Sequence, residues 1–222
     1  MNAAHDERMC RFCEAGIYFV TSQRLSVGRP TLDVLRAALD GGIRLVQLRE
    51  KELSTRDFAQ LAAEARTLTT GYGALLLVND RLDVALAVDA DGVHLGQDDL
   101  PLPAARRLAP ELIIGASTHT VAEALEAQAC GASYINIGPL FPTQTKVWSA
   151  EFLGLEGLAA IAPHARIPFT VMGGIKQAHI PALVAAGART IALVTAITAA
   201  CDPRQATAGL LAEYRRAIAA RA

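Results

Sequence analysis

The chain alternates between short apolar runs and longer segments in which apolar residues recur with the spacing of a helix. Eight runs, rich in Val, Ile, Leu and aromatic residues, are nearly continuously apolar, which is typical of strands buried on both faces. They are IYFVTS (17–22), LVQLRE (45–50), ALLLVND (74–80), GVHLGQ (92–97), IIGAST (113–118), YINIGPL (134–140), PFTVMGG (168–174) and TIALVTAI (190–197).

The segments between these runs have helical spacing of their apolar residues. The clearest examples are Leu32, Leu35 and Leu39 and, at the end of the chain, Leu210, Leu211, Tyr214 and Ile218. Strands that alternate with helices in this number predict an α/β fold, a (β/α)8 TIM barrel, as a single domain over residues 16–222 behind an N-terminal extension of residues 1–15. A doubly wound open sheet is the alternative, but VTSQRLSVGRP follows the start of the first run instead of a G-x-G-x-x-G turn.

Composition excludes several kinds of partner. The formal net charge is −1 and the pI is near 6.5, so we expect no nucleic acid. Apolar residues make up 52% of the chain but lie in segments far shorter than a membrane span, and residues 1–15 lack the apolar core of a signal peptide. We expect a soluble cytoplasmic protein that acts on small molecules. The sequence leaves a homo-oligomer open.

The four cysteines are too few and too scattered for a disulfide framework, which agrees with a reducing compartment. Cys10 and Cys13 form a C-x-x-C pair, but no second pair with metal-ligand spacing follows. We therefore expect incidental thiols there rather than a zinc or redox site. Cys130 and Cys201 lie among Ala and Gly beside helices and are expected to fill small core spaces.

Polar residues collect where the predicted strands end. In LVQLREK, residues 47, 49 and 51 share one face of the strand, so Gln47, Arg49 and Lys51 point the same way. A buried cation without a partner is costly, so these residues either form internal ion pairs or wait for an anion. Further polar strand ends are Asn79-Asp80, Gln97-Asp98-Asp99, Ser117-Thr118-His119 and, in the long connection 141–154, Thr143, Thr145 and Lys146. Barrel enzymes have their active sites at this end.

Two groups of residues indicate phosphate. Arg49, Lys51 and Lys146 would converge on the mouth of the barrel and suit a dense anion. Gly173-Gly174 and Val194-Thr195 end the seventh and eighth strands, where this fold often holds phosphate with backbone N–H groups. Taken alone, the glycines are equally compatible with a tight turn. Their position at the end of the seventh strand favours phosphate.

Two carboxylates at the same mouth indicate a metal. Asp80 and Asp99 end neighbouring strands, and Mg²⁺ typically uses one or two carboxylates together with substrate phosphates. Separate roles as helix caps or ion-pair partners, for instance of Asp99 beside the helix after Pro101, explain the spacing equally well.

The chain also resembles a known family. QLREK, LLLVNDRLDVALAVDADGVHLGQDDLP, IIGASTHT, GPLFPTQTK, VMGGI and LVTAI resemble, in order and with matching spacing over residues 17–205, the signatures of the thiamin-phosphate synthase family. This family has the same barrel and joins hydroxymethylpyrimidine diphosphate to a thiazole phosphate, which gives thiamin phosphate and pyrophosphate.

The resemblance implies a role for each matching residue. The pyrimidine diphosphate would be held by Gln47, Arg49, Lys51 and Asn79, with Ser117 and Lys146 completing that site. Mg²⁺ would be bound by Asp80 and Asp99. The thiazole phosphate would be held by Thr143, Thr145, Gly174, Val194 and Thr195. On this basis the cations at the end of the second strand pair with the substrate diphosphate rather than with the protein.

The mechanism that the family implies also suits the residue types. No serine, cysteine or lysine stands out as an activated nucleophile beside a base, so we expect no covalent enzyme intermediate. Mg²⁺, Arg49, Lys51 and Lys146 would stabilise charge on the departing pyrophosphate, and the thiazole nitrogen would capture the pyrimidine-methyl cation. We assign packing or hydrogen-bonding roles to His94 and His119.

Two other functions are alternatives to the synthase. A relative with the same barrel, the aminothiazole tautomerase, has a histidine two residues before the aromatic residue of the 141–154 connection, and here Pro139 precedes Phe141. A non-catalytic protein that binds thiazole or thiamin phosphate would tolerate loss of the two carboxylates, and both are present. The chain departs from the family pattern after Lys146, where Val147 and Trp148 replace a second lysine.

Overall fold

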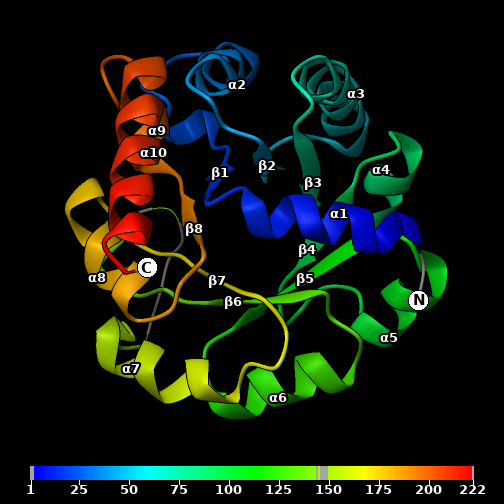
Figure 1. Ribbon diagram of the computed structural model, residues 1–222. Coiled ribbons are helices and arrows are strands. Elements are labelled where there is room, and N and C mark those ends of the chain that lie inside the picture. The colour runs from blue at the N-terminus through cyan, green and yellow to red at the C-terminus, as the bar shows by residue number, and fades with distance from the viewer. Residues whose placement is uncertain (1–2, 144, 146–149, 222) are drawn as a thin grey trace.

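The eight predicted strands form a closed parallel barrel in chain order (Figure 1), which confirms the predicted fold class. The computed structural model describes residues 3–143, 145 and 150–221. The strands are β1 (Ile17–Val20), β2 (Leu45–Leu48), β3 (Leu75–Asn79), β4 (Gly92–Leu95), β5 (Ile113–Thr118), β6 (Tyr134–Ile137), β7 (Phe169–Val171) and β8 (Thr190–Leu193). The barrel closes where Ile17 of β1 pairs with Ile191 of β8.

Helices surround the barrel and connect successive strands (Figure 1). The α-helices are α1 (Ala3–Glu14), α2 (Thr31–Asp40), α3 (Thr55–Gly71), α4 (Leu82–Ala87), α5 (Leu102–Leu108), α6 (Val121–Ala129), α7 (Gly154–Ile161), α8 (Ile180–Ala185), α9 (Thr195–Thr198) and α10 (Pro203–Ala219). The 3-10 helices of the described residues are η1 (Gln23–Leu25), η2 (Ala162–His164) and η3 (Gln177–His179). Side-chain caps fix the start of three helices, since Ser54, Thr120 and Asp202 each accept a backbone N–H from the first turn.

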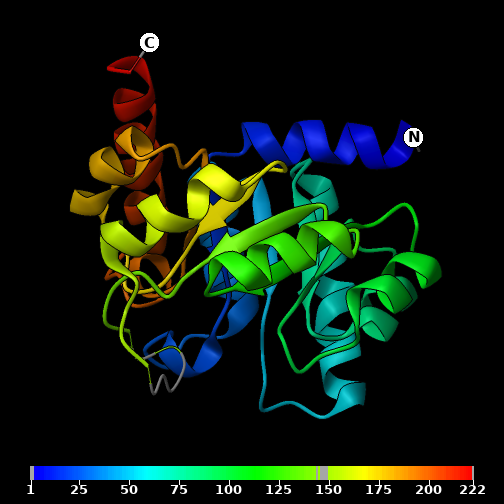
Figure 2. The ribbon, with the colours of Figure 1, turned by 90° about the horizontal axis from the view of Figure 1, so that it is seen from below.

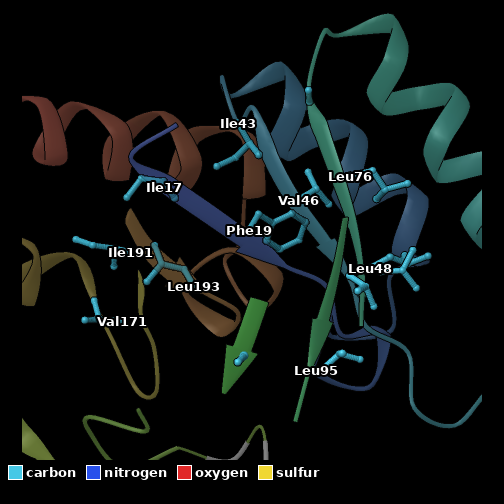
Figure 3. Packing of buried hydrophobic residues seen from close by; sticks show 14 of the residues in the cluster. Ile17, Phe19, Ile43, Val46, Leu48, Leu76, Leu95, Val171, Ile191 and Leu193 are labelled. Carbon is cyan, nitrogen blue, oxygen red and sulfur yellow. The ribbon is translucent and has the colours of Figure 1, made fainter. Parts of the chain in front are cut away.

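Alternation along each strand separates two cores. Ile17 and Phe19 of β1 point outward, and so do Val46 and Leu48 of β2, where they pack with side chains from the helices (Figure 3). Their neighbours in the chain point into the barrel and form a second, smaller cluster. The inward-facing members of that cluster on the strands are Tyr18, Val20, Leu45, Leu75, Leu77, Ile113, Tyr134 and Ala192. Both strand faces are therefore buried, as the continuous apolar runs predict.

The N-terminal segment forms helix α1, which lies across the amino-terminal end of the barrel (Figures 1 and 2). Phe12 is its one residue in the fully buried class, and it belongs to the cluster inside the barrel. Its ring centroid lies 4.5 Å from that of Tyr134 and 6.1 Å from that of Tyr18. The helix thus closes the end of the barrel opposite the predicted mouth.

No helix in the described part of the chain is both long and apolar enough to span a membrane.

Candidate active site

A cavity of about 450 Å³ opens where the strands end at their carboxyl termini. Every predicted site residue that the structure describes borders it, from the ends of seven strands, β2 to β8. These residues are Gln47, Arg49, Lys51, Asn79, Asp80, Asp99, Ser117, Thr143, Thr145, Gly174, Val194 and Thr195. Lys146 lies outside the described residues. The structure brings the described residues together, and their roles toward a ligand stay predictions.

Arg49 is the cation most suited to an anion. It follows the last residue of β2, and its backbone N–H donates to Thr21 Oγ1 over 2.9 Å. Burial lowers the pKa of the Arg49 guanidinium, an effect that the nearby Asp80 carboxylate opposes. Among the described residues no carboxylate lies within 4.0 Å of the guanidinium. A desolvated cation without an ion-pair partner is expected to attract an anion.

Lys51 has an ion-pair partner within the protein, and its pairing with a substrate stays a prediction. Its Nζ lies 3.0 Å from Asp80 Oδ2, and its side chain is 53% exposed. Exposed ion pairs contribute only about 0–1 kcal/mol, so a diphosphate or a metal ion could replace this pairing at small cost. The ion pair follows from register, because β2 and β3 are adjacent and both residues come just after the ends of these strands.

The two predicted metal ligands approach each other. Asp99 Oδ2 accepts the backbone N–H of Gly96 over 2.6 Å, which closes the turn after β4, and Pro101 rather than Asp99 is the N-cap of α5. Burial is the main cause that raises the pKa of the Asp99 carboxyl, and the neighbouring Asp80 carboxyl raises it further. Asp80 itself has a φ of +62°, in the left-handed region that few residues other than glycine adopt. Such strain recurs at functional sites.

This pair fits a hard divalent cation. Two carboxylates that approach each other repel, and a cation between them would remove both the repulsion and the burial penalty. No cluster of three or more His, Cys, Asp or Glu side chains suited to a metal is present among the described residues. A magnesium ion held here would therefore take its remaining ligands from substrate oxygens and water.

Ser117 borders the cavity from β5 and is held by two contacts. Its Oγ is 2.9 Å from His94 Nε2, and its backbone carbonyl accepts the Gln97 amide over 2.6 Å. His119 Nδ1 lies 2.9 Å from Glu123 Oε2 in the next helix, which agrees with the hydrogen-bonding role assigned to it.

The loops after β6 and β7 pack closely against each other. Gly174 has a φ of +61°, and a Cβ there would meet the backbone carbonyl of Phe141 at 2.7 Å. Phe141 N–H donates to the Gly173 carbonyl over 3.0 Å. Both expectations for these glycines therefore remain compatible with the structure, because they make a tight turn and also border the cavity. Thr143 Oγ1 accepts the Thr145 backbone N–H over 3.2 Å and orders the rim beside them.

Sequence reasoning missed several cavity residues. Asn136 projects into the barrel from β6 and accepts a hydrogen bond of 2.7 Å from Thr170. Met172 and Ile175 form part of the apolar wall. The strand alternation could have found Asn136, since it lies two residues after the inward-facing Tyr134.

The fold and the site together define an enzyme of the (β/α)8-barrel class whose mouth suits phosphorylated small molecules. The sequence model of the family described as thiamine monophosphate synthase matches residues 17–197. The chain belongs to this family.

Individual relatives agree. The chain is 50% identical over 186 residues to the thiamine-phosphate synthase of Chloroflexus aurantiacus, which covers 84% of this chain and 86% of that protein. It is 42% identical to the thiamine-phosphate synthase of Shouchella clausii, with 90% of this chain and 97% of that protein covered. The solved structure of a thiamine phosphate pyrophosphorylase from Pyrococcus furiosus superposes with a TM-score of 0.86 at 40% identity and covers 94% of this chain and 99% of that one.

Proposed function

We propose that the chain is a thiamin-phosphate synthase, which joins hydroxymethylpyrimidine diphosphate to a thiazole phosphate and releases pyrophosphate. The observation that carries the proposal is that the described family-matching residues all border one cavity, from the ends of seven strands. The protein's membership of the family and its sequence identity to synthases over most of their length support the same activity.

The diphosphate end of the substrate would lie beside β2 and β3. Arg49 and Lys51 would bind its oxygens, and Gln47 and Asn79 would add amide contacts from the barrel interior. Asp80 and Asp99 would hold Mg²⁺, which when bound neutralises charge on the diphosphate.

The thiazole phosphate would lie across the cavity beside the loops after β6, β7 and β8. Thr143 and Thr145 offer hydroxyl groups there, and Gly174 allows the phosphate to approach the backbone. Val194 and Thr195 complete this rim at the start of α9. The two phosphorylated substrates would thus enter with their reactive groups facing each other.

The chain's residues would act by positioning and by charge. The bond between the pyrimidine methylene carbon and the diphosphate oxygen breaks, and pyrophosphate leaves with the electron pair. Arg49 and Lys51 stabilise the negative charge that develops on it, and we infer the same role for Lys146 from its sequence position alone. The thiazole nitrogen then forms the new bond to carbon. The apolar wall that includes Met172 and Ile175 would limit access of water to the pyrimidine-methyl cation left by the departing pyrophosphate.

We also propose a cytoplasmic site of action, since all four cysteines are free, which agrees with a reducing compartment. Cys201 is exposed, so the expectation that it fills a core space is wrong. The partners would be the two small-molecule substrates. Light scattering on the purified protein would decide between a monomer and a homo-oligomer.

Mass spectrometry of the reaction mixture tests the function directly. Purified protein with both substrates and Mg²⁺ should form thiamin phosphate and one pyrophosphate for each product molecule. Conversion of the thiazole alone to an isomer would favour a tautomerase. Binding of either substrate without any product would favour a non-catalytic binding protein.

A further inference from the structure

A chain of hydrogen-bonded side chains crosses the interior of the barrel beneath the cavity. Gln47 Nε2 donates to Tyr18 Oη over 2.7 Å, and Tyr18 Oη lies 3.0 Å from Tyr134 Oη. Tyr134 Oη lies 2.8 Å from His94 Nδ1, and His94 Nε2 lies 2.9 Å from Ser117 Oγ. The hydrogen-bonded chain therefore joins three residues that border the cavity, Gln47, His94 and Ser117, through Tyr18 and Tyr134, which do not border it.

The hydrogen-bonded chain from Gln47 to Ser117 is buried and rigidly held. Exposure is 1% for Tyr18 and Gln47, 0% for Tyr134 and 4% for His94, so water has little access to it. The Tyr134 ring is inclined at 29° to the His94 ring at a centroid distance of 5.6 Å, and its centroid lies 4.5 Å from that of Phe12. Buried polar networks that are satisfied throughout fix the positions of their members.

A glycine makes room for the centre of the chain. Gly115 of β5 pairs in register with Tyr134 of β6, and a Cβ at position 115 would collide with the Tyr134 ring. The ring therefore passes over the backbone of β5 toward His94. Since no larger residue fits there, the path of the chain is built into the strand sequence.

The Gln47 amide at one end sets which partner donates in every hydrogen bond of this side-chain network. The amide nitrogen of Gln47 can only donate, so Tyr18 Oη accepts this hydrogen bond. The Tyr18 hydroxyl in turn donates its own hydrogen bond to Tyr134 Oη. Tyr134 must then donate to His94 Nδ1, because its proton has no other partner in the chain. His94 is left with its proton on Nε2 and donates it to Ser117 Oγ.

We propose that Tyr18, Tyr134 and His94 are positioning residues that fix Ser117 as a hydrogen-bond donor toward the substrate. Because Ser117 Oγ accepts from His94, its own proton is directed into the cavity, to a ring nitrogen or a diphosphate oxygen of the pyrimidine substrate. The opposite direction would leave Ser117 with only lone pairs to offer. This inference rests on the proposed function, and it adds three positioning residues to that site, of which His94 borders the cavity.

The electrostatics of His94 agree with this direction. Burial lowers the pKa of His94 to about 4, so the imidazole is neutral at pH 7. A neutral imidazole has one donor and one acceptor nitrogen, as a chain with a single direction requires.

Nitrogen NMR of the protein without substrate tests the direction. In protein labelled with ¹⁵N histidine, the His94 signals are identified by their absence from the His94→Gln variant. We expect a neutral ring at pH 7 with the proton on Nε2 and an unprotonated Nδ1. A proton on Nδ1, or a charged ring, would overturn the proposal.

A double-mutant cycle tests whether the chain acts through Ser117. We expect Tyr134→Phe to lower kcat/KM about tenfold, the factor that corresponds to ~1.4 kcal/mol for one hydrogen bond in the transition state. In a Ser117→Ala background the same change should have little effect, because the group it positions is gone. Equal losses in both backgrounds would show a merely structural role.

Tyr214→Phe is the matched control. It also removes one tyrosine hydroxyl, whose bond to the Arg189 carbonyl is 2.7 Å long, but it lies on α10 away from the cavity. We expect its kcat/KM to equal that of the wild type. If Tyr134→Phe does not fold, the NMR experiment on the wild type still decides the direction. A wild-type protein that makes no thiamin phosphate would refute the proposed function but not the tautomer result, so the two failures are distinguishable.

Discussion

Replacing Phe12 by alanine should destabilise the barrel far more than its position in an N-terminal extension suggests. The side chain is fully buried and fills the amino-terminal end of the barrel interior, against the rings of Tyr18 and Tyr134. No other residue of α1 is in the fully buried class. The loss of this ring would open a cavity at the base of the barrel.

The magnitude follows from the buried area. A fully buried aromatic side chain removes roughly 150–250 Å² from water. At ~25 cal/mol per Å² this burial contributes about 4–6 kcal/mol. Alanine retains a small part of it, so we expect a loss of about 3–5 kcal/mol in the free energy of unfolding, as for other Phe→Ala changes in cores. Natural domains have about 5–15 kcal/mol in total.

Urea unfolding followed by circular dichroism would measure the loss, with the slope against urea compared between variants. Cys10→Ala on the exposed side of the same helix is the control, and we expect its effect to stay within about 0.5 kcal/mol. A Phe12→Ala loss below about 1 kcal/mol would refute the reasoning, because a buried ring cannot be removed so cheaply from a closed interior.

Three further predictions concern the cavity. Arg49→Ala should lower kcat/KM by the equivalent of about 1.5–3 kcal/mol while the unfolding curve stays near that of the wild type, because a charge-assisted contact to the diphosphate is lost. Asp80→Ala and Asp99→Ala should each abolish the dependence of the rate on Mg²⁺, with the double variant little worse than either, and calorimetry with Mg²⁺ and pyrophosphate should show the same pattern. Gly174→Ala should destabilise the fold by at least about 1–2 kcal/mol, measured by urea unfolding, since its positive φ disfavours a Cβ and the Phe141 carbonyl is too close.

Each of these has a result that would contradict it. Normal kinetics for Arg49→Ala would remove this residue from the diphosphate site. Additive losses at Asp80 and Asp99 would indicate separate roles, such as the Lys51 ion pair and the turn at Gly96. An unchanged unfolding curve for Gly174→Ala would show that the loop after β6 can move away from it.

The strands were predictable because burial on both faces leaves a continuous apolar run that no other element of this length requires. Their ends were not. The run 190–197 was predicted as one strand, but β8 ends at Leu193 and α9 begins at Thr195. Apolar content alone does not separate a strand from the helix that follows it.

The grouping of the site residues was predictable once the barrel was inferred, because parallel strands deliver their carboxyl ends to one face. The Lys51–Asp80 pair was missed, because it depends on how far each side chain reaches beyond the sheet. The chain of hydrogen bonds from Tyr18 through Tyr134 to His94 was missed for a different reason. Its contacts join residues 116 and 40 positions apart, and they exist only because the barrel closes.

Helix α1 was not predicted at all. It contributes one fully buried side chain, so its sequence lacks the repeated apolar positions from which a packed helix is normally inferred. One buried residue produces no helical periodicity in the sequence.

The position of α1 also decides how the protein can be joined to other molecules. Both described ends of the chain lie on the side of the barrel that α1 covers (Figure 2), while the cavity opens at the other end of the strands. A linker attached ahead of Ala3 or after Arg221 would thus leave the cavity facing away from whatever it is joined to. Coupling through either end to a solid support, or to a second catalytic domain, should leave entry of both substrates unobstructed.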